Sequence, residues 1–95
     1  MTRKTASFSK TGIANLPNDK PAVYAIETAG GKTNYVGIAK RGRVAERLGE
    51  HLPGARDAVP GARVRVQQML SIDDARAKEA RLIARVQPKY NKQGK

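Results

Sequence analysis

A carboxylate lies among apolar residues in the last long segment with helical periodicity. At 100° of rotation per residue, Glu79 projects into the middle of an apolar stripe. The stripe consists of Ile72, Ala75, Leu82, Ile83 and Val86, and the far side is expected to carry Lys78, Arg81 and Arg85. Burying an unpaired carboxylate is costly. The pattern therefore allows two interpretations of Glu79: a buried ion pair with an arginine, or a metal ligand at the floor of a cleft.

A second pair of polar residues, Arg47 and His51, is separated by four positions. On a helix this spacing places both side chains on one face. The planar guanidinium could bind a phosphate through two hydrogen bonds, and the imidazole could donate a hydrogen bond or carry a proton. The alternative is a solvated arginine that pairs with Glu46 or Glu50, and a histidine that only ends the helix.

Two tyrosines lie on either side of a Gly30-Gly31 turn. Both glycines tolerate positive φ, so the turn predicts a hairpin. Pairing about it sets Tyr24 opposite Gly37 and Tyr35 opposite Ile26, with all four residues on one face. Gly37 then leaves room beside two phenols. Buried tyrosines are more often core residues than catalysts, so both readings stay open.

These positions require a small α+β fold. We expect strands at Ala22–Thr28, Asn34–Ala39 and, at an edge, Arg63–Leu70. A short helix is expected at Val44–Leu52, and a longer one from a weak capping box at Ser71 and Asp74 to Gln87, where Pro88 stops it. Residues 1–20 are interpreted as a flexible basic arm before a domain at 21–95. The predicted order is β-β-α-β-α, with a three-stranded antiparallel sheet flanked by helices.

Composition narrows the classes of function. The 95 residues suffice for one domain, and 19 Lys and Arg against 8 Asp and Glu give a net charge of +11, which attracts polyanions. Without cysteine and with one histidine, neither disulfides nor a zinc site is expected. Four aromatic residues are too few for a base-stacking platform. No apolar run approaches the roughly 20 residues of a membrane span, and no signal-peptide core is present, so the expected location is the cytoplasm.

Together these residues resemble the signature of the GIY-YIG nuclease family. Its first two motifs correspond to Pro21-Ala22-Val23-Tyr24 and Tyr35-Val36-Gly37. They are followed by Arg47 and His51 at the family spacing, and by Glu79 before Pro88-Lys89-Tyr90-Asn91. The resemblance covers residues 16–91. Three departures occur: Ala22 replaces the usual glycine, Arg41-Gly42-Arg43 lengthens the loop before Arg47, and Glu46 stands where some members have a basic residue.

The resemblance implies a metal-dependent endonuclease that hydrolyses phosphodiester bonds with one divalent cation, Mg²⁺ or Mn²⁺. Glu79 would be the protein ligand of the metal, and Tyr24 would activate or orient the attacking water. Arg47 would counter the charge that develops on the phosphate. Tyr35 and His51 would position water and phosphate through hydrogen bonds.

The same resemblance assigns substrate binding to Lys40, Arg41, Arg43 and Asn91, with Asn91 bracing the site. DNA is favoured over RNA because most relatives act on DNA. Target choice would then come from loops, a protein partner or a homo-oligomer. The main alternative is a non-catalytic nucleic-acid-binding protein on the same fold, for which a carboxylate at position 79 would serve no purpose.

Overall fold

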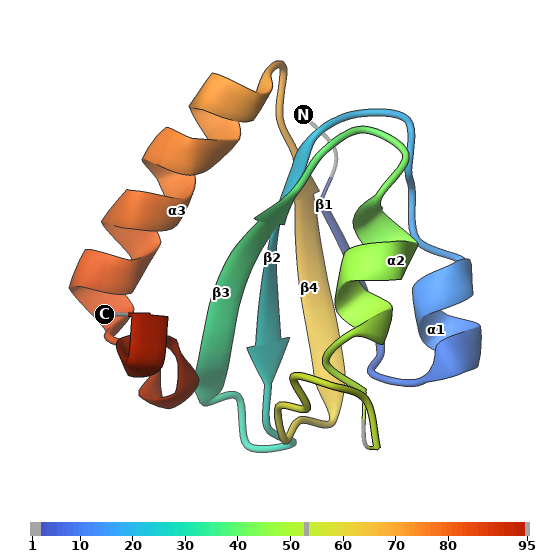
Figure 1. Ribbon diagram of the computed structural model, residues 1–95, viewed down its shortest axis with the longest axis vertical. Helices are drawn as coiled ribbons and strands as arrows, with labels where there is room; N and C mark the ends of the chain where they lie inside the picture. The colour runs from blue at the N-terminus through green and yellow to red at the C-terminus, as the bar shows by residue number, and fades with distance from the viewer. Residues whose placement is uncertain (1–2, 53, 95) are drawn as a thin grey trace.

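The computed structural model describes residues 3–52 and 54–94, and its fold is α+β (Figure 1). The strands are β1 (Arg3–Ser7), β2 (Ala22–Glu27), β3 (Thr33–Ala39) and β4 (Arg63–Gln68). The helices are α1 (Lys10–Ala14), α2 (Val44–Gly49) and α3 (Ile72–Val86), followed by the 3₁₀ helix η1 (Lys89–Gly94). The strands form one antiparallel sheet in the order β1-β4-β2-β3. Helices α1 and α2 lie on one side of this sheet, and α3 lies on the other beside β3 (Figure 1).

Alternation along the strands divides the core into two layers. Tyr24 and Ile26 of β2 face α1 and α2, where they pack with Leu48 and other buried residues. Val23 of the same strand faces α3, where it packs with Val36, Met69 and Ala75. None of the helices in the described part of the chain is long and apolar enough to cross a membrane.

The expected sheet of three strands is one strand short. β1 pairs with β4 in the register Thr5↔Arg65, so β4 lies inside the sheet and the prediction that it is an edge strand was wrong. After β1, the Ser9 hydroxyl accepts a hydrogen bond from the Gly12 amide and caps α1. These elements lie within the segment that was interpreted as a flexible arm. β1 has no sequence signal because Thr5 and its neighbours are largely solvent-exposed, which leaves no apolar alternation to detect.

The predicted hairpin register is confirmed. Tyr24 pairs with Gly37 and Ile26 pairs with Tyr35 between β2 and β3. Gly31 adopts φ 94°, a value that L-amino acids other than glycine rarely adopt. At Gly37, an added Cβ would lie 2.6 Å from both Cζ and the hydroxyl oxygen of Tyr24. The glycine therefore provides the space that the Tyr24 ring occupies.

Replacing Gly37 with alanine is expected to lower the free energy of unfolding by about 1–3 kcal/mol, because the new methyl group overlaps a buried ring. Urea denaturation measures this change. Gly49→Ala is the matched control, since a Cβ there meets no atom within 4 Å. Equal stability of the two variants would show that the Tyr24 ring can move at no cost.

The ends of α3 follow their predicted signals, whereas the C-terminal end of α2 does not. The Ser71 hydroxyl accepts a hydrogen bond from the Asp74 amide at 3.1 Å, and α3 ends at Gln87 in the left-handed region. Helix α2 is shorter than predicted, so His51 lies beyond its last residue, Gly49. Its first turn is instead fixed from a distance: the Asn18 side-chain oxygen accepts a hydrogen bond from the Val44 amide at 2.8 Å.

Candidate active site

A chain of two hydrogen bonds joins Tyr24 to the backbone at Asp57 through His51. The Tyr24 hydroxyl lies 3.2 Å from Nε2 of His51, and Nδ1 of His51 lies 2.9 Å from the Asp57 carbonyl oxygen. A carbonyl oxygen only accepts, so Nδ1 of His51 must carry a proton. In the neutral imidazole, Nε2 then accepts a hydrogen bond from the Tyr24 hydroxyl. The loop carbonyl therefore sets both the tautomer and the orientation of His51.

Tyr35 lies beside this pair at the wall of a cavity. Its ring centroid is 4.6 Å from that of His51 and 6.2 Å from that of Tyr24. The cavity has a volume of ≈ 600 Å³, within the range of ligand sites, and Arg47, Glu50 and His51 also line it. Tyr24 is only 1% exposed, whereas Tyr35 is half-buried. Of the two phenols, Tyr35 is thus the one that reaches the cavity.

Arg47 connects this cavity to a second one. The second cavity, of ≈ 310 Å³, contacts Arg47 together with Lys40, Arg43 and Arg76, and every charged residue at its wall is basic. The side chain of Arg47 is 45% exposed, and its guanidinium forms an ion pair of 3.4 Å with Glu50. Arg47 therefore pairs with Glu50, as one of the two alternatives predicted. Because the pair lies at the cavity wall, Arg47 is still accessible to a ligand.

Glu79 lies half-buried on α3. Burial raises the pKa of the Glu79 carboxyl, and Arg76 partly opposes this effect. Within the described residues Glu79 forms no ion pair, so the alternative of a buried pair with an arginine is not met. Burial is the main cause that raises the pKa of Tyr24 and of Tyr35; the charge of Arg47 opposes this rise and the charge of Glu79 adds to it. The carboxylate and the guanidinium thus act on the same two hydroxyls.

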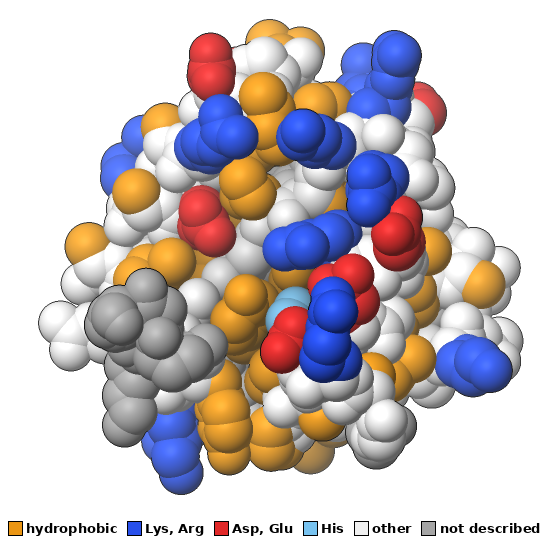
Figure 2. Space-filling view, in the orientation of Figure 1, with side chains coloured by type: hydrophobic (Ala, Val, Ile, Leu, Met, Phe, Trp, Pro, Cys, Tyr) orange, Lys and Arg blue, Asp and Glu red, His pale blue; other side chains and the backbone are white. Residues whose placement is uncertain are grey.

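Charged side chains of both signs gather around a hollow in the middle of the molecular face that α2 and α3 border (Figure 2). The five residues predicted to be catalytic come from four separate elements or loops: Tyr24 on β2, Tyr35 on β3, Arg47 and His51 on and just after α2, and Glu79 on α3. The hydrogen bond, the ring packing and the shared cavity bring Tyr24, Tyr35, Arg47 and His51 to one region. Glu79 is connected to them by the effect of its charge on the pKa of both phenols. Folding therefore assembles residues that lie up to 55 positions apart, as Tyr24 and Glu79 do.

Comparison with known proteins gives one consistent result. No protein-family model matches the sequence, and no curated protein does. Among solved structures, the magnesium-bound GIY-YIG N-terminal endonuclease domain of UvrC from Thermotoga maritima matches with a TM-score of 0.66 and 27% identity, over 86% of this chain and 93% of that one. An asparagine-to-alanine variant of that domain, bound to its catalytic divalent cation, matches with a TM-score of 0.65 and 27% identity over 85% and 91%. The chain is a GIY-YIG domain.

The donor set of this GIY-YIG domain fits a cation held by a single carboxylate. No group of three His, Cys, Asp or Glu side chains that could hold a metal occurs among the described residues. Mg²⁺ keeps several waters and needs only one or two protein carboxylates, with substrate phosphate completing its shell. A half-buried carboxylate whose pKa is raised by burial, with no cation paired to it, is consistent with such a ligand.

The predicted substrate-binding residues occupy different surroundings. Lys40 and Arg43 line the second cavity, where Arg43 also forms an ion pair with Glu46. Arg41 is exposed and lines neither cavity. The Asn91 amide is used differently: its Oδ1 accepts from the Val36 amide at 2.8 Å, and its Nδ2 donates to the Val36 carbonyl at 2.9 Å.

These two bonds satisfy backbone groups on the free edge of β3. Val36 lies between Tyr35 and Gly37, so Asn91 of η1 holds the part of the strand that carries the cavity phenol. This geometry agrees with the expected bracing role. With both polar atoms of its amide bonded to the backbone, Asn91 is better described as a positioning residue than as a substrate contact.

Three groups at the site were not identified from the sequence. The Asp57 carbonyl contributes no side chain, so it has no residue signature. Asn18 caps α2 from a loop that lies 26 positions away. Arg76 precedes Glu79 by three positions, and this spacing alone places the two on one helical face. For Arg76 the signal was present in the sequence.

The phenol of Tyr35 provides a test of this arrangement. Burial raises its pKa, and Arg47 is the strongest influence that lowers it. Arg47→Gln removes a cation that favours the phenolate, so the pKa of Tyr35 should rise further and the phenolate fraction at a given alkaline pH should fall. Carbon-13 NMR of the tyrosine Cζ resolves this titration. Arg43→Gln is the control and should leave it unchanged; a lower pKa in Arg47→Gln would contradict the geometry.

Proposed function

We propose that this GIY-YIG domain is a divalent-cation-dependent endonuclease that hydrolyses phosphodiester bonds in DNA. The observation that carries the proposal is geometric: Tyr35, Arg47 and His51 line one cavity, and the Tyr24 hydroxyl lies 3.2 Å from Nε2 of His51. The half-buried Glu79 adds a negative charge that raises the pKa of both phenols in addition to the larger effect of burial. The net charge of +11 supports a polyanionic substrate. The magnesium-bound endonuclease domain of UvrC, to which the chain is similar, supports the cation.

Glu79 would hold the cation, Mg²⁺ or Mn²⁺. When bound, such an ion polarises the phosphate and stabilises charge on the leaving oxygen. Arg47 would bind a phosphate oxygen and counter the charge that grows during attack. Its planar guanidinium suits this task, because the ion pair with Glu50 is long and leaves other N–H groups available.

We assign contact with the attacking water to Tyr35 rather than to Tyr24. The Tyr24 hydroxyl is buried and already donates to His51, whereas Tyr35 lines the cavity shared with Arg47. Because its pKa is raised, Tyr35 is a neutral phenol near neutral pH. It would therefore orient the water through a hydrogen bond. Full deprotonation of Tyr35 would require additional positive charge nearby, which the cation and Arg47 supply.

Tyr24 and His51 would act as positioning residues for Tyr35. The hydrogen bonds from Tyr24 to His51 and from His51 to the Asp57 carbonyl fix the imidazole against which the Tyr35 ring packs. Lys40, Arg43 and Arg76 would bind the substrate backbone along the second cavity, which meets the first at Arg47. A protein partner or a second copy of the chain would supply target choice, and the cytoplasm is the proposed place of action.

The proposal is tested by incubating the purified protein with supercoiled plasmid, single-stranded DNA and RNA, each with Mg²⁺ or with a chelator. Nicked plasmid that forms only with the cation is the expected result, with slower or no cleavage of RNA. Plasmid that is bound but never cut would favour the non-catalytic nucleic-acid-binding alternative. Faster cleavage of RNA than of DNA would retain the chemistry and overturn the choice of substrate.

A further inference from the structure

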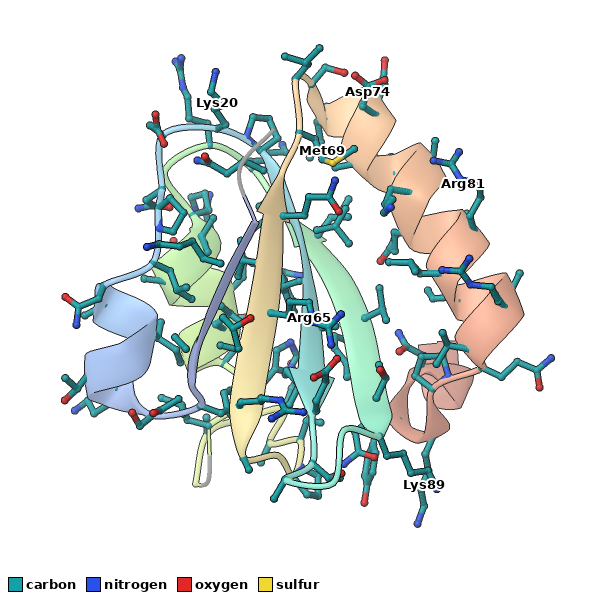
Figure 3. All side chains as sticks on the ribbon, turned by 180° about the vertical axis from the view of Figure 1, so that it is seen from behind. Lys20, Arg65, Met69, Asp74, Arg81 and Lys89 are labelled. Carbon is teal, nitrogen blue, oxygen red and sulfur yellow. The ribbon has the colours of Figure 1, made fainter. Side chains whose placement is uncertain are left out.

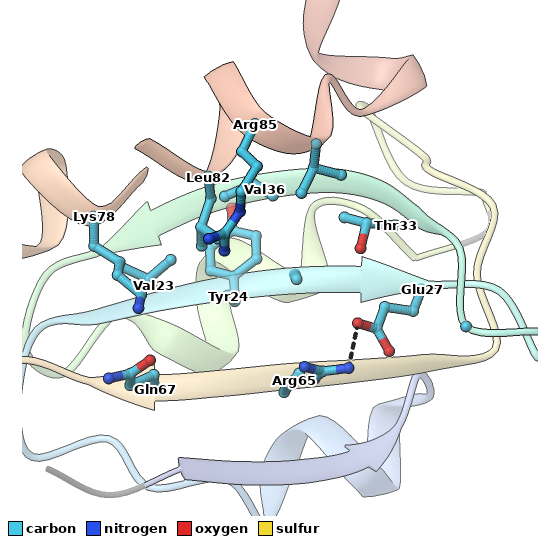
Figure 4. A pocket seen from close by; sticks show the side chains of 13 residues that line it. Val23, Tyr24, Glu27, Thr33, Val36, Arg65, Gln67, Lys78, Leu82 and Arg85 are labelled. Carbon is cyan, nitrogen blue, oxygen red and sulfur yellow. Dashed lines mark ion pairs between the residues drawn. The ribbon is translucent and has the colours of Figure 1, made fainter. Parts of the chain in front are cut away.

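A third cavity lies on the other face of the sheet, between α3, β2 and β4. Its volume is ≈ 370 Å³, within the range of small-molecule sites. The floor is apolar and includes Val23, Val36 and Leu82, and polar side chains border it (Figure 4). Tyr35, Arg47 and His51 line a different cavity, and of the five candidate catalytic residues only Tyr24 lines this one.

Two cations of α3 border this cavity. Lys78 and Arg85 extend from the helix over the sheet (Figure 4), although the sequence pattern placed them on the far side of α3. They are seven residues apart and share a helical face with Leu82 between them. Arg81, by contrast, points away from the sheet (Figure 3). Within the described part of the chain, neither Lys78 nor Arg85 forms an ion pair.

The cations of the opposite wall are already neutralised in part. Glu27 is buried, and its two carboxylate oxygens pair with Arg63 at 3.1 Å and with Arg65 at 2.7 Å. Among the described residues that line the cavity, Glu27 is the only acidic one, and Arg65 also lines it. At the wall itself the charges of Glu27 and Arg65 cancel, so the net charge of the lining is the +2 of Lys78 and Arg85, and Arg63 adds a further positive charge behind Glu27. Gln67 and Thr33 add neutral hydrogen-bonding groups at the border.

We propose that this cavity binds a nucleotide that carries a terminal phosphomonoester. A phosphomonoester has a charge of about −1.5 to −2 near neutral pH, which matches the two unpaired cations, whereas an internal phosphodiester has half that charge. The guanidinium of Arg85 can bind phosphate oxygens in pairs, and the ammonium of Lys78 adds a point charge. The base packs on the apolar floor, and Gln67 and Thr33 face its polar edge. The ligand is either a free nucleotide or the phosphorylated end of a strand.

The test measures binding in the presence of a chelator, so that it does not depend on cleavage. The probes are a deoxynucleoside monophosphate, its nucleoside, and one short oligonucleotide with and without a 5′-phosphate. Nitrogen-15 NMR is expected to show saturable shifts at Val23, Ala25 and Val36, but not at His51, with the phosphorylated probes. Saturation by the mononucleotide alone identifies a free nucleotide as the ligand. Saturation by both phosphorylated probes identifies strand ends, and either result supports the proposal.

The variant Lys78→Gln/Arg85→Gln should weaken binding of the phosphorylated probes by at least about tenfold. The matched control, Lys20→Gln/Arg81→Gln, has the same net charge and should change binding by less than about twofold. Circular dichroism checks that both variants are folded. Equal weakening in the two variants, shifts centred on His51, or tighter binding of an acidic peptide than of the nucleotide would each overturn the proposal.

Discussion

Glu79→Gln is expected to reduce cation-dependent nicking by more than about a hundredfold, because loss even of the groups that support a metal ligand costs roughly ten- to a hundredfold. Binding of DNA in a chelator should persist, since the basic residues are unchanged. The measurement is the initial rate of plasmid nicking over a range of Mg²⁺ concentrations. Asp74→Asn is the matched control, as an exposed carboxylate on the same helix, and should nick at the rate of the unmodified protein.

The same substitution should not destabilise the fold. Burial raises the pKa of Glu79 in the folded state, so the proton on this carboxyl stabilises the fold below the ordinary glutamate pKa. That contribution is lost as the pH rises through the folded-state pKa, and near neutrality the ionised side chain opposes folding. Thermal unfolding of Glu79→Gln should therefore occur at an equal or higher temperature near neutrality, with a smaller gain in acid. An unstable, fully active variant would contradict both roles.

Tyr35→Phe is expected to lower the cleavage rate by about 10²–10⁴-fold, the usual contribution of a group that acts on the proton of the nucleophile. Its stability should change little, because the Tyr35 hydroxyl lies at a cavity. Tyr24→Phe should instead affect the stability of the fold more than the cleavage rate. It leaves Nε2 of the buried His51 without its donor, which should cost about 1–3 kcal/mol of unfolding free energy.

The two tyrosine variants serve as controls for each other. Single-turnover nicking rates and urea denaturation of both variants give the comparison. If Tyr24 acts through His51, adding His51→Ala to Tyr24→Phe should cost less than His51→Ala alone, since the interaction is already lost. A Tyr24→Phe variant that is stable but inactive, together with an active Tyr35→Phe variant, would return the water-contacting role to Tyr24.

The sequence pattern could not predict that the two tyrosines have different roles. The Gly30-Gly31 turn and the strand period place both phenols on one face, and the register is as predicted. The two-residue period of a strand determines on which face of the sheet a side chain lies, but not how deeply it is buried. Tyr24 is buried because β2 lies between β4 and β3, and Tyr35 reaches a cavity because β3 is an edge strand. The pairing of β2 with β4, which fixes this order, joins strands that are distant in the sequence, so no local pattern indicates it.

Residues on α3 show the same limit. The apolar stripe predicted the half-buried position of Glu79, because helical geometry fixes which residues share a face. It did not predict that Lys78 and Arg85 lie over the sheet, since long side chains can cover apolar surface while their charged ends stay in water. Whether a basic residue faces solvent or a cavity depends on how much of the sheet the helix covers, which is set by tertiary packing.

The central claim is that Glu79, Arg47 and Tyr35 surround one cation site. Titration with Mn²⁺ tests it most directly, because the ion broadens NMR signals of nearby nuclei. The account predicts selective broadening at these three side chains in the unmodified protein and its loss in Glu79→Gln. Broadening centred on Asp73 and Asp74 at the start of α3, or broadening that persists unchanged in Glu79→Gln, would contradict it.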